Sequence, residues 1–228
     1  MSFARLLVPA LAAAALVYGQ AKPVRFDFRV RNDLFAGFAG DQAALKRGIE
    51  TCEQVLENDP NHAEALVWLG SANVFLAGQE FQKGNPQAGS ALSQKGITQM
   101  DRAVELESRN IGVRIPRGAT LMSMAGNLPD SPFRQGVLER ARSDYQLAFD
   151  LQQDRLDKLG VHPLGELLQG LGNLHSLLGK TEEAERYYKM IEARLQDTIY
   201  AKRAALWMET RKPLPAAQTA CVGCHTGR

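Results

Sequence analysis

The sequence predicts an all-α protein in which antiparallel helix pairs repeat as an α-solenoid, with long insertions between some of the helices. One observation is a spacing of small and large residues that recurs between residues 28 and 195. A second is the abundance of Ala, Leu, Gln and Glu, which form helices well. A third is the lack of any run that alternates Val, Ile or Thr with polar residues, as a half-buried strand would. The 228 residues suffice for one sizeable domain or two small ones.

Residues 1–21 are expected to be a signal peptide. Arg5 supplies a positive charge, and an uncharged apolar stretch follows over 6–17. Small residues stand at Gly19 and Ala21, which predicts cleavage after Ala21 and a periplasmic or otherwise exported protein. The alternative is a membrane anchor, but the apolar stretch is shorter than the about 20 residues that span a bilayer. No membrane span is expected after cleavage.

The first helix pair is expected over 28–38 and from Asp41 onward. In four second helices, successive positions are separated by four, three and five residues, which places them on one helix face. These positions are Gly48, Cys52, Val55 and Pro60; Gly96, Met100, Ala103 and Ser108; Ala141, Tyr145, Ala148 and Gln153; and, as far as the match extends, Ala184, Tyr188 and Ile191. The intervening partner helices are centred on Gly70, Gly118 and Gly172, where the lack of a side chain lets two helices approach closely.

This pattern resembles the tetratricopeptide repeat. The best local matches are Asp-Pro-Asn-His-Ala-Glu-Ala-Leu-Val-Trp-Leu-Gly over 59–70 and Leu-Gly at 171–172 followed by Gly-Lys-Thr-Glu-Glu-Ala over 179–184. The resemblance covers about 28–195 and implies a repeat domain, 22–195, whose surface binds protein partners. The chain departs from the family in three turn-rich segments, which predict loops or extended helices and make a peptide groove of the usual shape doubtful. These segments are 83–86, 127–132 and 160–163.

A capping helix is expected over 192–210. Ile199, Leu206 and Trp207 lie there among charged residues, as in a helix that covers the open face of a last repeat. Prolines beyond it end the helix and leave a tail over 211–228.

The tail carries the sequence Cys-Val-Gly-Cys-His over 221–225, which is the attachment motif of c-type haem. Two thiols bond to the porphyrin, and the histidine is the proximal iron ligand. We therefore expect one covalent haem c, held by Cys221, Cys224 and His225. The segment 219–227 resembles the opening of a cytochrome c domain, in which a helical domain follows the motif and covers the haem. Because few residues follow here, the resemblance implies that the repeat helices or a partner cover the haem, or that little does.

Other interpretations of the motif stay open. A thioredoxin-type redox pair would begin a helix in a β-α-β domain, which the pattern does not predict. A zinc site would need a further ligand, and none is close in sequence. A disulfide between Cys221 and Cys224 would leave no cofactor.

A sixth iron ligand would come from upstream. The candidates are His175, on a helix just after Gly172, and Met208, on the capping helix. His62 and His162 are further candidates, although His62 suits a helix cap. Cys52 takes a core position and is expected to be a buried, inert thiol.

These patterns favour electron transfer or docking to a redox partner protein. A scaffold without a functional haem, and a haem peroxidase or gas sensor, stay as alternatives, and no catalytic residue is identified. The 27 basic and 25 acidic residues give no reason to expect nucleic-acid binding. Three cysteines are too few for disulfides to hold an exported protein together, so its core must do so.

Overall fold

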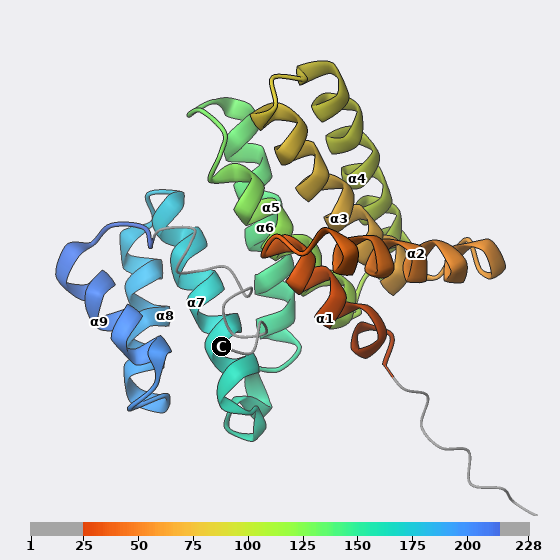
Figure 1. Cartoon of the computed structure of the whole chain (residues 1–228). Coiled ribbons are helices and arrows are strands. Elements are labelled where there is room, and N and C mark those ends of the chain that lie inside the picture. The colour runs from red at the N-terminus through yellow and green to blue at the C-terminus, as the bar shows by residue number, and fades with distance from the viewer. Residues whose placement is uncertain (1–24, 215–228) are drawn as a thin grey trace, which may run out of the picture.

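The computed structural model describes residues 25–214, and this part of the chain is a superhelix of antiparallel α-helices without strands. Figure 1 follows the helices from red to blue along the chain. The elements are α1 (Asp27–Phe38), α2 (Gln42–Asn58), α3 (Ala63–Gln82), α4 (Pro86–Leu106), α5 (Ile111–Ala125), α6 (Pro132–Asp150), η1 (Gln153–Lys158), α7 (Val161–Leu177), α8 (Thr181–Arg194) and α9 (Ile199–Thr210). The expected all-α repeat fold is confirmed. The expected signal peptide and the haem motif lie outside the described residues.

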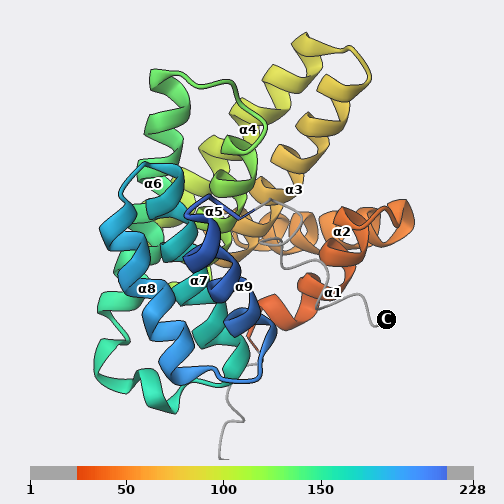
Figure 2. The same cartoon turned by 90° about the vertical axis from the view of Figure 1, so that its left-hand side faces the viewer.

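The helices pair as α1 with α2, α3 with α4, α5 with α6 and α7 with α8. The first helices of the pairs, α1, α3, α5 and α7, supply most of the inner, concave face. Consecutive pairs stack through α2 on α3, α3 on α5 and α6 on α7. At the C-terminal end α9 packs beside α8 and α7 (Figure 2).

The recurring spacing in the sequence corresponds to a recurring contact between paired helices. A Cβ atom on Gly70 would lie 2.6 Å from the carbonyl oxygen of Gly96 and 2.7 Å from the Met100 side chain. In the next pair, a Cβ on Gly118 would lie 2.8 Å from Tyr145. Gly172 repeats this arrangement against Tyr188, at 2.9 Å. A glycine in the first helix therefore faces the same pattern position of the second helix in three successive pairs.

The boundaries of the first pair agree with expectation. The helix expected over 28–38 is α1, and the Asp41 side chain caps α2 by accepting a hydrogen bond from the Ala44 N–H at 2.9 Å. Much of the inserted length is helical and lies within the second pair, because α3 and α4 extend over 20 and 21 residues. The remaining excess forms a loop before α6 and the short η1 before α7.

The prediction of a single helix over 192–210 is wrong about where that helix begins. The chain leaves α8 at Arg194, Asp197 adopts a left-handed φ of 61°, and Thr198 caps a separate α9. Only one of the three apolar residues thought to cover the last repeat does so. Trp207 is fully buried and stacks on Tyr188 with ring centroids 4.6 Å apart, whereas Ile199 and Leu206 are exposed.

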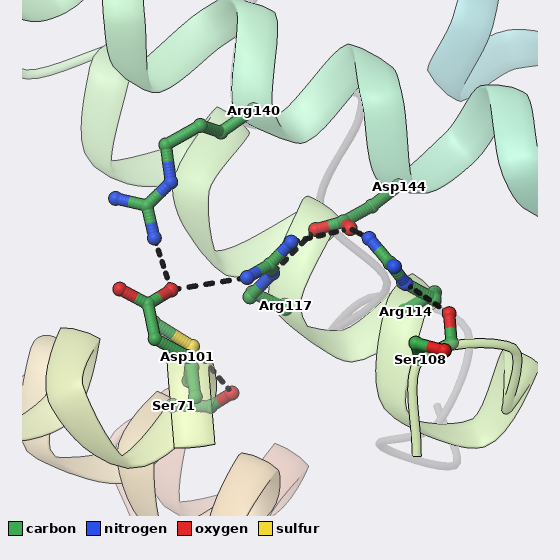
Figure 3. A network of polar contacts seen from close by, with 8 residues as sticks. Ser71, Asp101, Ser108, Arg114, Arg117, Arg140 and Asp144 are labelled. Atoms are coloured by element: carbon green, nitrogen blue, oxygen red, sulfur yellow. Dashed lines mark hydrogen bonds and ion pairs between the residues drawn. The ribbon is translucent and has the colours of Figure 1, made fainter. Parts of the chain in front are cut away.

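A buried ionic network joins the middle helices. Asp144 of α6 is fully buried and accepts hydrogen bonds from Arg114 and Arg117 of α5, three contacts of 2.7 Å each. Arg117 also donates to Asp101 of α4 at 3.0 Å, and Asp101 contacts Arg140 of α6 as well (Figure 3). Three consecutive helices are thereby tied together by charge as well as by apolar contact.

Candidate functional site

The described residues form a concave groove of about 1580 Å³, which is lined mostly by α1, α3, α5 and α7 and also by Leu214. Aromatic side chains are concentrated at its α1–α3 wall, and they are Phe35, Phe38, Trp68, Phe75 and Phe81. Phe35 and Trp68 meet edge to face with centroids 5.7 Å apart, and Phe38 contacts Phe75 at 4.8 Å. Ligand sites combine such apolar walls with a few polar groups.

The polar residues of the groove include three arginines, Arg25, Arg31 and Arg134, and the acids Asp27 and Glu166. Two of these arginines neutralise Asp27, which contacts Arg25 at 3.0 Å and Arg31 at 3.4 Å. The groove is therefore suited to an apolar ligand that carries negative charge.

The chain itself enters this groove after α9. Arg211 ends the helix in the left-handed conformation, at a φ of 54°, which turns the backbone out of the helix. Three residues later Leu214 is only 5% exposed and lines the groove. Its N–H donates to Oδ1 of Asn173 on α7 at 2.8 Å, and Asn173 itself is 2% exposed.

Asn173 also connects the end of the described chain to α5. Its Nδ2 donates to the sulfur of Met122 at 3.8 Å. Met122 and Met124 both line the groove, so two thioether groups lie along the α5 wall. Leu214, Asn173 and Met122 thus form a continuous series of contacts from the chain end into the groove.

Two buried hydrogen-bond donors of the α1–α3 wall have no partner among residues 25–214. They are Nε of Arg31 and Nε1 of Trp68, and Trp68 is 7% exposed. Buried polar groups are normally paired, so unpaired donors that line a groove indicate where a ligand acceptor would bind. The spacing of residues along the chain does not single out either of them.

The structure places the two candidate sixth ligands away from the groove lining. Asn173 and Leu177 of α7 line the groove, and His175 lies about 200° around the helix from each of them. Met208 is half-buried against the core on α9. The expected haem residues Cys221, Cys224 and His225 lie beyond the described chain.

His175 instead occupies a closed position between α7 and α8. It is 6% exposed, its ring stacks on Tyr187 at 5.5 Å, and neither ring nitrogen has a hydrogen-bond partner in the part of the chain that the structure describes. Burial, followed by the nearby charge of Arg142, lowers the pKa of His175 below its usual 6.5. The ring is therefore held neutral in the folded chain near neutral pH.

The other histidines and the upstream cysteine have local roles. His62 caps α3, because its Nδ1 accepts a hydrogen bond from the Ala65 N–H at 3.1 Å, as its sequence position suggested. His162 lines the groove, with Nδ1 2.8 Å from the Tyr200 hydroxyl and Nε2 3.5 Å from Glu166. Cys52 is fully buried, as expected, and burial raises the pKa of its thiol to about 12.

No protein-family model matches the chain, and no curated protein is detectably similar to it. Among residues 25–214, no helix combines the length and apolar character needed to cross a bilayer. The same residues hold no cluster of three metal-binding side chains.

Proposed function

We propose that this chain is an exported, tetratricopeptide-like protein that carries one haem c and transfers single electrons between redox proteins. Cys221 and Cys224 would hold the porphyrin by thioether bonds, and a ring nitrogen of His225 would bind the iron. Haem c, when bound, supplies a one-electron centre whose potential depends on axial ligands, neighbouring charge and burial.

The observation that carries the proposal is the course of the chain after α9. Leu214 is anchored in the concave groove through Asn173, and Cys221 follows seven residues later. Seven residues reach at most about 25 Å when fully extended. The attachment motif is therefore tethered close to a large apolar hollow formed by the same chain.

The residues of the groove fit a haem in their chemistry. Aromatic and aliphatic side chains would exclude water from a porphyrin, and arginines would pair with its two propionate groups. The thioethers of Met122 and Met124 belong to a ligand class that iron accepts in c-type cytochromes. These features support the proposal that the repeat domain itself covers the haem.

Expression in a bacterial strain with the c-type maturation machinery tests this function. We expect the intact mass to rise by one haem, the haem stain to persist on a denaturing gel, and a pyridine haemochrome spectrum of the c type. Cys224→Ala should abolish most of the attachment, whereas His225→Ala should mainly alter the spectrum. N-terminal sequencing should begin at or near Lys22. Wild-type chain without covalent haem would contradict the proposal.

The second candidate is a scaffold that binds a protein segment. The size and aromatic wall of the groove favour it, because repeat domains present such concave surfaces to partners. This function would survive the loss of both Cys221 and Cys224, so partner capture that is equal with and without these thiols would support the scaffold over electron transfer.

A further inference from the structure

We propose that the haem of residues 221–225 sits against the α1–α3 wall of the concave groove, where Arg31 and Trp68 bind one of its propionate carboxylates. This inference rests on the proposed function and adds the position of the haem and the residues that hold it.

The two tryptophans of the chain differ in how their N–H groups are paired. The N–H of Trp207 donates to the Ser176 hydroxyl at 2.8 Å, so its burial leaves no donor unpaired. Trp68 is also buried, but its Nε1 has no partner among the described residues. Burying an N–H without an acceptor is unfavourable, so a ligand acceptor at Trp68 would stabilise the structure.

Arg31 presents a second unpaired donor on the same wall. It lies one turn before Phe35 on α1, and Phe35 contacts Trp68. Its Nη1 reaches Asp27 at 3.4 Å, while its Nε is buried without a partner.

The chemistry of these two groups selects the ligand. Both Arg31 Nε and Trp68 Nε1 are donors, so their common ligand must accept hydrogen bonds. The charge of Asp27 is shared between Arg25 and Arg31, which leaves a net positive charge at this end of the groove. A carboxylate meets both requirements, because it accepts hydrogen bonds and carries negative charge. If the carboxylate belongs to an apolar ring system, that ring can also pack against the aromatic side chains of the same wall.

The chain's own haem can reach this wall. Leu214 is bonded to Asn173, and Asn173 contacts Met122 of the α5 wall. This wall adjoins α3 directly, because the Thr120 hydroxyl donates to that of Ser71 at 2.8 Å. Both Ser71 and Thr120 line the groove, and Ser71 lies one turn after Trp68. The occupant is therefore tethered beside its site, which raises its effective concentration there.

Redox titration of the haem-loaded chain tests the position with matched variants. Arg31→Gln removes a positive charge beside the haem, and Trp68→Phe removes only the N–H and part of the ring. Arg29→Gln is the control for charge, because Arg29 is exposed on the same helix outside the groove. Trp207→Phe is the control for the ring, because Trp207 lies outside the groove.

We expect Arg31→Gln and Trp68→Phe to lower the midpoint potential, because a carboxylate that loses its partners favours the oxidised iron. The two controls should leave the potential unchanged. In wild-type protein, amide hydrogen exchange in α1 and α3 should be slower with haem than in the Cys221→Ala/Cys224→Ala chain. This last measurement does not depend on how the groove variants fold.

Equal potentials in each variant and its control, with equal exchange in α1 and α3 with and without haem, would overturn the assigned position while leaving the proposed function intact. Failure of the wild-type chain to acquire haem would overturn both. A partner protein can be added to the chain without haem. If it slows exchange in α1 and α3 as much as haem does, a carboxylate of that partner, and not the haem propionate, is the ligand of this wall.

Discussion

Replacement of Asp144 by asparagine should destabilise the fold far more than the loss of a surface ion pair. Asp144 is fully buried, and its two oxygens accept three hydrogen bonds of 2.7 Å from Arg114 and Arg117. An asparagine would keep one acceptor but lose the charge, and would leave two largely buried guanidinium groups without their main counterion.

The structure sets the expected size. Breaking a buried ion pair by removing one partner costs about 3–5 kcal/mol. The lower end applies here, because Arg117 keeps its 3.0 Å contact with Asp101. Burial alone would lower the pKa of Arg117, but hydrogen bonding and charge from Asp144, then from Asp101, raise it overall. For a domain of this size, about 3 kcal/mol corresponds to a fall in Tm of roughly 6–12 °C.

The assay is thermal unfolding followed by far-UV circular dichroism, with Asp33→Asn as the matched control. Asp33 accepts from Arg47 at the same distance, 2.7 Å, and also joins two helices, but that pair is exposed. Water screens the exposed charges and solvates the arginine that remains, so the control should hardly move Tm. Similar losses in the two variants would refute the reasoning that burial sets the strength of the Asp144 network.

Four further outcomes are expected. Gly70→Ala should cost about 1–3 kcal/mol, because the new methyl group would lie 2.6 Å from the Gly96 carbonyl oxygen. In α6, Gly136→Ala should stabilise the fold by about 0.5–1 kcal/mol, because the new Cβ meets nothing within 4 Å. Denaturant titration measures the stability of both glycine variants, and a change of the same sign in the two would refute the packing argument. His175→Phe should flatten the dependence of stability on pH below about 6.5, measured by urea titration at several pH values. Below about pH 6.5 the unfolded chain binds a proton at His175 that the folded chain does not bind, so the stability of the wild-type protein falls as the pH drops. An unchanged slope of stability against pH in the variant would exclude His175 as the cause. In the Cys221→Ala/Cys224→Ala chain, Cys52 should resist alkylation until the protein unfolds, since a pKa raised from 9.0 to about 12 leaves roughly a thousandfold less thiolate; rapid labelling of folded protein would contradict this.

The helix pairs could be predicted because a local spacing encodes them. The steps from Gly48 to Pro60 and from Gly96 to Ser108 reflect one packing arrangement, and neighbouring helices in a solenoid are also neighbours in sequence. The break before α9 was missed because helical spacing continues across it, and the left-handed Asp197 has no strong sequence signal. In that helix the apolar residues Ile199 and Leu206 were not distinguishable from Trp207 without knowing which face meets α8.

The candidate site could be predicted less well. The motif at 221–225 is local, whereas the groove depends on contacts between distant residues. Leu214 meets Asn173 across 41 residues, and Trp68 meets Phe35 across the first pair. His175 looked available on a helix, but only the packed structure shows that its side of α7 faces α8 and not the groove.

If the chain is exported and loaded with haem as proposed, the position of Cys52 has a consequence for the order of those events. In an oxidising compartment, a third accessible thiol competes for mixed disulfides with a nearby Cys-x-x-Cys pair. Export delivers the N-terminal part of a chain first. Cys52 is fully buried on α2, which packs against α1 and α3, and it lies far ahead of Cys221 in the sequence. Once these helices have folded, the buried thiol of Cys52 no longer reacts. The proposed attachment of haem at Cys221 and Cys224 then proceeds without competition from a third thiol.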